Sequence, residues 1–145
     1  ISCGKTPILV GDCAGFIVNR ILLPYMNEAA FILQQGSKIE KIDNIIKDFG
    51  MPMGPFTLAD TVGVDIGYKV ATILNESYGS RMPIASIIEK MYNAKLLGKK
   101  TKAGFYEYAG RDAYPNSHVT SMLENNNKII EDDEIVQRCI YIMIN

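Results

Sequence analysis

Two long stretches of this chain carry apolar side chains at the spacing of an amphipathic helix. Between Phe16 and Gln35 the apolar positions recur every three or four residues, and Gly36 follows directly. This period is that of one helix face, and glycine often ends a helix. Pro24 lies inside the stretch, where it removes one backbone donor and crowds the preceding turn, so we expect a kink or a break there. The apolar set is Phe16, Leu22, Leu23, Met26, Ala30 and Leu33.

Further helices follow at short intervals, separated by glycine and proline. Ser37 and Glu40 have the spacing of a capping box, which predicts the start of a second helix that ends at Gly50. Three later helices are expected because each begins with a residue that favours a helix start: Pro55 to Ala59, Asp65 to Asn75, and from Pro83 onward. The sequence therefore predicts an all-α fold.

The last third of the chain changes character. Residues 98–108 predict an ordered turn, whereas residues 109–128 are rich in Gly, Pro, Ser and Asn and predict a linker. Beyond it, the run Ile135 to Arg138 repeats the pattern of Ile17 to Arg20, and Asn145 falls where Asn27 does. We therefore expect a helical domain over 1–108, a linker over 109–128, and the truncated start of a second helical repeat over 129–145.

Composition limits the classes of function that remain. The formal net charge of the 145 residues is −1, so the chain has no basic stripe of the kind that binds nucleic acid. We expect no membrane insertion and a cytoplasmic protein, because no apolar run approaches the roughly 20 residues of a spanning helix. Three cysteines without a metal-binding spacing predict reduced thiols and no metal site. Because the chain starts at Ile1, we expect a piece of a longer protein or a processed one.

The first predicted helix carries the most specific motif of the chain. The pattern is D-x-x-G-F-x-x-N-R-x-x-x-P, and G-M-P-M-G-P-F and G-K-K-T-x-x-G-F-Y follow it in order. Over residues 5–108 this order resembles the helical domain of the 3-hydroxyacyl-CoA dehydrogenases. Ala14 stands where that family usually has Pro, and Lys102 and Ala103 replace a more usual Gly-Lys pair. The motif residues are Asp12, Gly15, Phe16, Asn19, Arg20 and Pro24.

This resemblance implies a fold, a reaction and partners. The fold is the C-terminal helical domain of the 3-hydroxyacyl-CoA and 6-phosphogluconate dehydrogenase type, here without its Rossmann domain. The reaction is NAD-dependent oxidation of (S)-3-hydroxyacyl-CoA to 3-oxoacyl-CoA in fatty-acid β-oxidation, as in the large multifunctional proteins. NAD and the catalytic His and Glu belong to the Rossmann domain, and this chain has no G-x-G-x-x-G after a strand. We expect acyl-CoA and the Rossmann domain as partners, a homodimer, and no activity from the chain alone.

Asn19 is the candidate catalytic and substrate-binding residue. It shares a helix stripe with Leu23, Met26 and Ala30, where an amide is costly to bury unless its donor and acceptor find partners. The resemblance implies that this partner is the oxygen of the acyl-CoA substrate together with the polar site of the Rossmann domain. The alternative is an internal amide bonded to a neighbouring carbonyl, such as the one that Pro24 leaves free.

The cationic residues have two interpretations each. Arg20 braces a domain interface, or it is an exposed or ion-paired helix arginine. The lysines of the 98–108 segment approach the phosphates of CoA, or they lie on a solvated turn, which the sequence favours. They are Lys99, Lys100 and Lys102.

Three further polar or turn residues are expected to be structural. Helix capping accounts for Asp60, and Gly104 is expected in a turn that needs positive φ. His118, the only histidine, lies in the polar linker and is expected at the surface rather than as a catalytic base.

Two alternatives to the dehydrogenase interpretation stay open. One is a non-catalytic helical module that mediates assembly. The other is the helical domain of a related dehydrogenase that acts on small hydroxy acids, a group of related architecture that lacks the Asn-Arg-Pro spacing.

Overall fold

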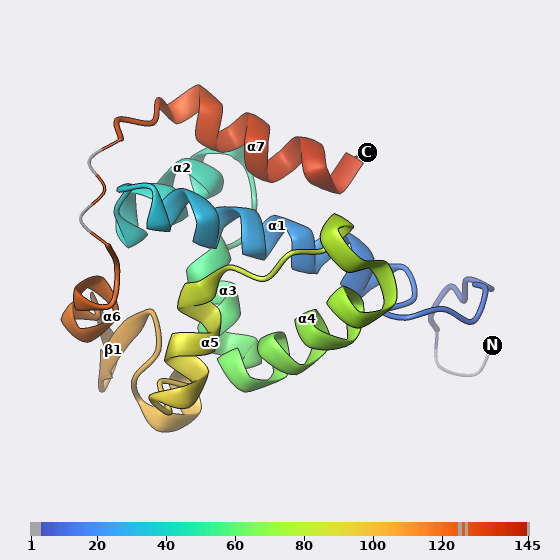
Figure 1. Ribbon diagram of the computed structural model, residues 1–145, viewed down its shortest axis with the longest axis horizontal. Helices are drawn as coiled ribbons and strands as arrows, with labels where there is room; N and C mark the ends of the chain where they lie inside the picture. Colours follow the sequence, from blue (N-terminus) through green and yellow to red (C-terminus); the bar gives the residue numbers. More distant parts are fainter. Residues whose placement is uncertain (1–3, 125, 127, 145) are drawn as a thin grey trace.

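Helices dominate the computed structural model, which describes residues 4–124, 126 and 128–144 (Figure 1). The expected all-α fold is confirmed, with one small β-hairpin added to it. Within the described ranges, no helix combines the length and hydropathy that a membrane crossing requires. The elements are α1 (Val18–Gln34), α2 (Ile39–Phe49), α3 (Pro55–Val62), α4 (Val64–Tyr78), α5 (Ser86–Asn93), β1 (Tyr106–Ala109), β2 (Asp112–Pro115), α6 (Ser117–Ser121) and α7 (Asp132–Ile144), with short 3-10 turns at Gly79–Arg81 and Lys99–Thr101.

Helix α1 is the central element, against which α2, α3, α4, α5 and α7 all pack. It begins at Val18 rather than Phe16 because Gly15 and Phe16 have φ values of 76° and 48°. It then runs through Pro24 as one helix, so the expected alternative of a local break is wrong. Its buried side chains form the middle of the core, and they are Tyr25, Ala29, Ala30, Ile32 and Leu33.

The predicted capping box at Ser37 is wrong. Helix α2 begins at Ile39, its N-cap is Lys38, and no side chain caps it. The backbone N–H of Ser37 instead donates to the Ile32 carbonyl over 3.4 Å, so this residue belongs to the turn that closes α1 after Gly36. The predicted end at Gly50 is confirmed, since Gly50 is the C-cap with a φ of 123°.

Two other helix starts differ from their predictions. Pro55 is the first residue of α3 as expected, but α4 starts directly after Gly63, and Asp65 lies in its first turn instead of capping it. Helix α5 starts at Ser86 rather than at Pro83. The delay has a cause in the core, because the Asn27 side chain donates to the Pro83 carbonyl (2.6 Å) and accepts from the Ala85 N–H (2.8 Å).

The segment 109–128, predicted as a linker, contains regular structure over part of its length. Strands β1 and β2 pair antiparallel, with Tyr106 opposite Pro115, and Gly110 makes the turn between them with a φ of 65°. Asn116 is buried, and its side chain accepts from the His118 N–H (2.9 Å) to cap α6. The Gly and Asn residues that suggested a linker therefore build a hairpin turn and a helix cap.

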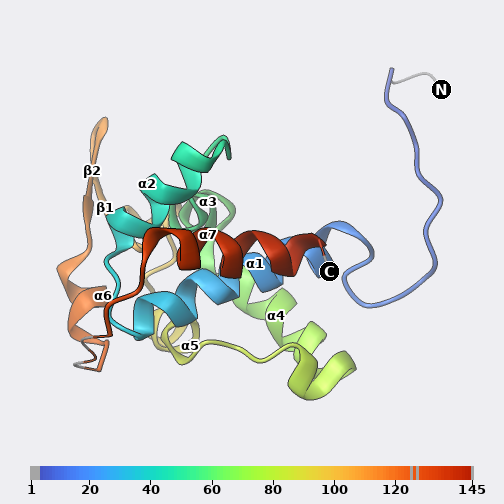
Figure 2. The same ribbon diagram turned by 90° about the horizontal axis from the view of Figure 1, so that it is seen from above.

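Helix α7 docks on the first part of the chain, where it packs against α1 and α2. Figure 2 shows α7 lying along α1, with the hairpin and α6 at the far side of the molecule from the start of α1. Ile135 and Cys139 are completely buried, and burial raises the pKa of the Cys139 thiol to about 12, which keeps it protonated. Cys3 lies outside the described residues.

Candidate functional site

A tight turn before α1 fixes the direction in which its first residues point. The Phe16 N–H donates to the Cys13 carbonyl (3.1 Å), and Tyr78 donates from its hydroxyl to the Ala14 carbonyl (3.2 Å). A Cβ on Gly15 would lie 2.7 Å from a methyl group of Leu74, and the φ of 76° also disfavours any other residue. Gly15 is therefore required twice over, by backbone conformation and by packing against α4.

Asn19 follows this turn in the first turn of α1 and is partly buried. Its backbone N–H donates to the Gly15 carbonyl over 3.2 Å. Within the described part of the chain, its side-chain amide makes no hydrogen bond, so the alternative of an amide held by a neighbouring carbonyl finds no support. The polar partner that the sequence called for is not supplied by the described residues of this chain.

Arg20 is exposed beside Asn19 and makes no ion pair with any described residue. Its guanidinium donates to the Cys13 sulfur over 3.6 Å and lies 5.2 Å from the centre of the Tyr78 ring. These contacts hold its side chain along the turn before α1.

Asp43 was not singled out by the sequence and is one of two fully bonded carboxylates in the core. It is 2% exposed and accepts from the Phe56 N–H (2.8 Å), from the Thr57 N–H (3.0 Å) and hydroxyl (2.7 Å), and from the Tyr106 hydroxyl (3.0 Å). It therefore caps α3 from a neighbouring helix. Its signal in the sequence is an acid on the Ile39–Ile42–Ile46 stripe, a position that demands partners.

Asp60 is the second such carboxylate, and its predicted role as a helix cap is wrong. It is 1% exposed and accepts from the Phe105 and Tyr106 N–H groups and from the Tyr108 hydroxyl, each over 2.9 Å. Burial raises the pKa of Asp60, although the hydrogen bonds from Tyr106 and Phe105 act to lower it. With its donors supplied by the hairpin, Asp60 anchors β1 to α3 and has a structural role.

Two motif glycines are explained by these carboxylates. A Cβ on Gly54 would collide with the Asp43 side chain, and a Cβ on Gly104 would collide with the Asp60 carboxylate. The prediction of a positive φ at Gly104 is wrong, because Gly104 is absent from the positive-φ glycines and is needed instead for close approach.

The lysine cluster lies on the 3-10 turn and the residue that follows it. Lys100 pairs with Asp65 of α4, and Lys99 lies 5.9 Å from the centre of the Tyr108 ring. Lys102 has a φ of 58°, a conformation that suits the glycine that the resembling family usually has there. Lys99 and Lys102 line a broad surface hollow together with Lys47 and Arg111. The arrangement is that of a solvated turn braced by one ion pair.

The single histidine of the chain does not lie near Asn19. His118 is exposed on α6, at the opposite side of the molecule from the start of α1 in both views (Figures 1 and 2). In the ranges that the structure covers, no group of three His, Cys, Asp or Glu side chains is placed to hold a metal. The strands of these same ranges form one antiparallel hairpin rather than the parallel sheet that a dinucleotide requires, so these residues do not fit NAD.

Known proteins resemble the chain along nearly its whole length. The family described as 3-hydroxyacyl-CoA dehydrogenase, C-terminal domain, matches residues 15–108. The fatty acid oxidation complex subunit alpha of Vibrio cholerae is 45% identical over 145 residues, which are 98% of this chain and 20% of that protein. The chain thus spans about a fifth of the length of the curated relatives it matches.

Solved structures agree with this match, and one of them covers nearly the whole chain. The dehydrogenase part of multifunctional enzyme 1 from C. elegans is 30% identical with a TM-score of 0.73, covering 99% of this chain and 34% of that one. An (S)-3-hydroxybutyryl-CoA dehydrogenase from Ralstonia eutropha is 38% identical with a TM-score of 0.71, covering 73% of this chain and 38% of that one. From its motifs, its fold and these matches, the chain belongs to the 3-hydroxyacyl-CoA dehydrogenase family and is its C-terminal helical domain.

Proposed function

We propose that this domain supplies the substrate side of an NAD-dependent 3-hydroxyacyl-CoA dehydrogenase that works in fatty-acid β-oxidation. The observation that carries the proposal is the side-chain amide of Asn19, which bonds to no described residue and lies at the start of α1. An amide held half-buried on a helix, with no partner in its own described domain, is suited to meet a polar group from outside it. The amide N–H would donate to the oxygen on the 3-carbon of the acyl-CoA and hold it in place.

NAD and the acid-base pair belong, in this proposal, to a Rossmann domain in the longer enzyme. The nicotinamide cofactor supplies hydride acceptance there. The catalytic His and Glu belong to that domain, so the contribution assigned to Asn19 is positioning. We therefore expect that the isolated chain neither binds NAD measurably nor oxidises 3-hydroxyacyl-CoA. Oxidation of 3-hydroxyacyl-CoA by the purified 145-residue chain, above the rate of a blank, would contradict the assignment of NAD binding and proton transfer to another domain.

The domain organisation is part of the same proposal. Residues 1–108 form the substrate-side domain, and residues 129–145 form the start of a second repeat, joined by the hairpin and α6. A multifunctional origin is favoured because the C. elegans multifunctional enzyme covers 99% of the chain, whereas the Ralstonia eutropha enzyme covers 73%. Apolar side chains left exposed on α1, among them Ile17 and Val18, favour a homodimer of the chain. Light scattering should then give twice 16.1 kDa.

The test of the proposed role is Asn19→Ala in the longer enzyme. We expect turnover to fall about 5- to 150-fold, the effect of one well-placed hydrogen bond of roughly 1 to 3 kcal/mol, with NAD affinity unchanged. The matched control is Gln137→Ala, because Gln137 holds the same place in the second repeat and is expected to leave turnover unchanged. Wild-type turnover in Asn19→Ala would favour the alternative of an amide with a structural role within the domain.

A further inference from the structure

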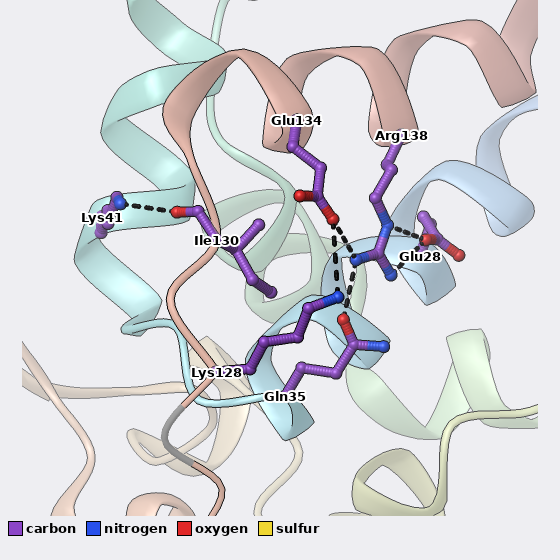
Figure 3. Close-up of polar contacts among 7 residues, drawn as sticks. All are labelled: Glu28, Gln35, Lys41, Lys128, Ile130, Glu134 and Arg138. Atoms are coloured by element: carbon purple, nitrogen blue, oxygen red, sulfur yellow. Dashed lines mark hydrogen bonds and ion pairs between the residues drawn. The ribbon is translucent and has the colours of Figure 1, made fainter.

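Cationic side chains of this domain differ in whether they have partners within it. Arg138 has several. Figure 3 shows its guanidinium between α1 and α7, donating to the Glu28 carboxylate (2.7 Å), to the Gln35 side chain (2.7 Å) and to Glu134 (3.3 Å). A cation bonded in this way stabilises its own domain, whereas a cation without an anionic partner is available to a ligand.

Four exposed cations of the second kind surround one surface hollow, which we call the basic hollow. None of them makes an ion pair with a described residue. They come from three separate segments, namely α2, the 3-10 turn with the residue after it, and the turn of the hairpin, which stands beside α2 in Figure 2. The hollow measures about 810 Å³, within the range of roughly 300 to 1,000 Å³ that small-molecule sites occupy. The four cations are Lys47, Lys99, Lys102 and Arg111.

Asp43 does not neutralise the basic hollow, although it is the one acidic side chain among the described residues that line it. It is 2% exposed, and its two oxygens already accept four hydrogen bonds from α3 and β1. Glu107 lies between Tyr106 and Tyr108, which line the hollow, and strand alternation points the Glu107 side chain to the other face. The basic hollow therefore has an excess of positive charge and suits an anion.

Lys102 occupies this hollow at a cost in backbone conformation. Its φ is 58°, in the left-handed region that a residue with a Cβ adopts only with strain, whereas Gly110 serves the φ of 65° across the hollow. The turn holds Lys102 there, because its N–H donates to the Lys99 carbonyl (3.1 Å) and its carbonyl accepts from the Tyr108 N–H (2.9 Å). Strain of this kind is commonly kept where a side chain serves a function, and here it places an ammonium group at the hollow.

We propose that the basic hollow binds a small molecule through a diphosphate or triphosphate group. A chain of phosphates presents successive anionic groups, which matches cations that converge from three segments better than a single carboxylate does. Arg111 can bind phosphate oxygens with two parallel N–H groups, and the lysines act as point charges. Lys99 is already oriented by the Tyr108 ring, whose centre lies 5.9 Å from its ammonium nitrogen.

The experiment is calorimetric titration of the 145-residue chain with inorganic tripolyphosphate at constant ionic strength. The variant is Lys102→Gly, which removes the ammonium group and relieves the left-handed conformation at the same time. The matched control is Lys95→Gly, because Lys95 is exposed with a φ of 60° and is not among the residues that line the basic hollow. Urea unfolding of both variants checks that they fold and measures the relief of strain.

We expect both glycine variants to shift the unfolding equilibrium toward the folded state by about two- to fivefold. Only Lys102→Gly should weaken tripolyphosphate binding, by about three- to tenfold. Absence of binding by the unmodified chain, equal affinity in Lys102→Gly, or an equal loss in Lys95→Gly would each overturn the proposal.

The nature of the ligand is tested by three further titrations. Orthophosphate should bind at least about tenfold more weakly than tripolyphosphate, because it engages fewer of the cations. Equal affinities for the two would overturn the assignment to a phosphate chain. ADP and CoA both contain a diphosphate, and binding of either supports the proposal and identifies the carrier. If neither binds, the hollow does not accept a phosphate chain attached to an organic group, and the proposal fails.

Discussion

Polar side chains at the start of α1 and in the core beneath the hairpin differ in whether they have hydrogen-bond partners within the domain. Under the hairpin, Asp43 and Asp60 are buried, and backbone N–H groups and hydroxyls donate to both carboxylates. At the start of α1, the backbone N–H of Asn19 donates to the Gly15 carbonyl, but its side-chain amide bonds to no described residue. A polar group whose partners lie within its own domain stabilises that domain, whereas one left without them is available to a substrate or another domain.

The largest effect should come from removing a carboxylate under the hairpin. Asp60→Ala leaves two backbone N–H groups and the Tyr108 hydroxyl without their acceptor, and we expect it to lower the free energy of unfolding by about 3 to 5 kcal/mol. Urea unfolding followed by circular dichroism measures the loss. Asp65→Ala is the control, because its pairing with Lys100 lies near the surface and should be worth at most about 1 kcal/mol. If Asp60→Ala and Asp65→Ala lost equal free energies of unfolding, the difference between a buried carboxylate and one near the surface would be contradicted.

A smaller loss of stability should follow from placing a methyl group in the space that the Asp60 carboxylate occupies. Gly104→Ala pushes a methyl group into the Asp60 side chain and should cost about 1 to 3 kcal/mol. Gly67→Ala is the matched control near the start of α4, where an added Cβ has no atom within 4 Å, and it should stabilise the chain by about 0.5 to 1 kcal/mol. Differential scanning calorimetry of the pair should show melting temperatures that move in opposite directions.

These residues also show how far the sequence alone can lead. The helical period predicted α1, α2 and the all-α fold, because burying one face of a helix requires apolar residues every three or four positions. The roles of Asp60 and Gly104 were assigned wrongly because their partners lie on elements distant in the chain, α3 and β1. Likewise, Asn27 delays the start of α5 through bonds to residues 83–85 that no local pattern reveals.

In the candidate site and its surroundings, too, the sequence predicted what rests on local signals and missed the rest. Asn19 was identified from its motif and from the cost of an amide on an apolar stripe, both of which are local signals. The hairpin and α6 were missed because Gly110 and Asn116 serve a turn and a cap, and the same residue types also make linkers.

The pKa values of Asp60 and Asp65 should be shifted in opposite directions, and a titration of the folded protein can measure both. Burial raises the pKa of Asp60, so the folded state binds more protons there than the unfolded chain, and its contribution to stability falls as pH rises from the usual 3.8 to the raised value. The Lys100 hydrogen bond lowers the pKa of Asp65, so its contribution is present above 3.8 and is lost as pH falls through the lowered value. Carboxyl carbon chemical shifts should give midpoints on opposite sides of 3.8. Midpoints on the same side would contradict the assigned environments.

The most direct measurement compares two asparagines of α1 in the isolated chain. The Asn27 side chain donates to Pro83 and accepts from Ala85, whereas the Asn19 side chain bonds to no described residue. The free energy of unfolding in urea of Asn19→Leu should therefore lie within about 0.5 kcal/mol of wild type or above it, while Asn27→Leu should lose about 2 kcal/mol or more. A loss of about 1 kcal/mol or more in Asn19→Leu would show that its amide is bonded within the domain, and would contradict its assignment to the substrate.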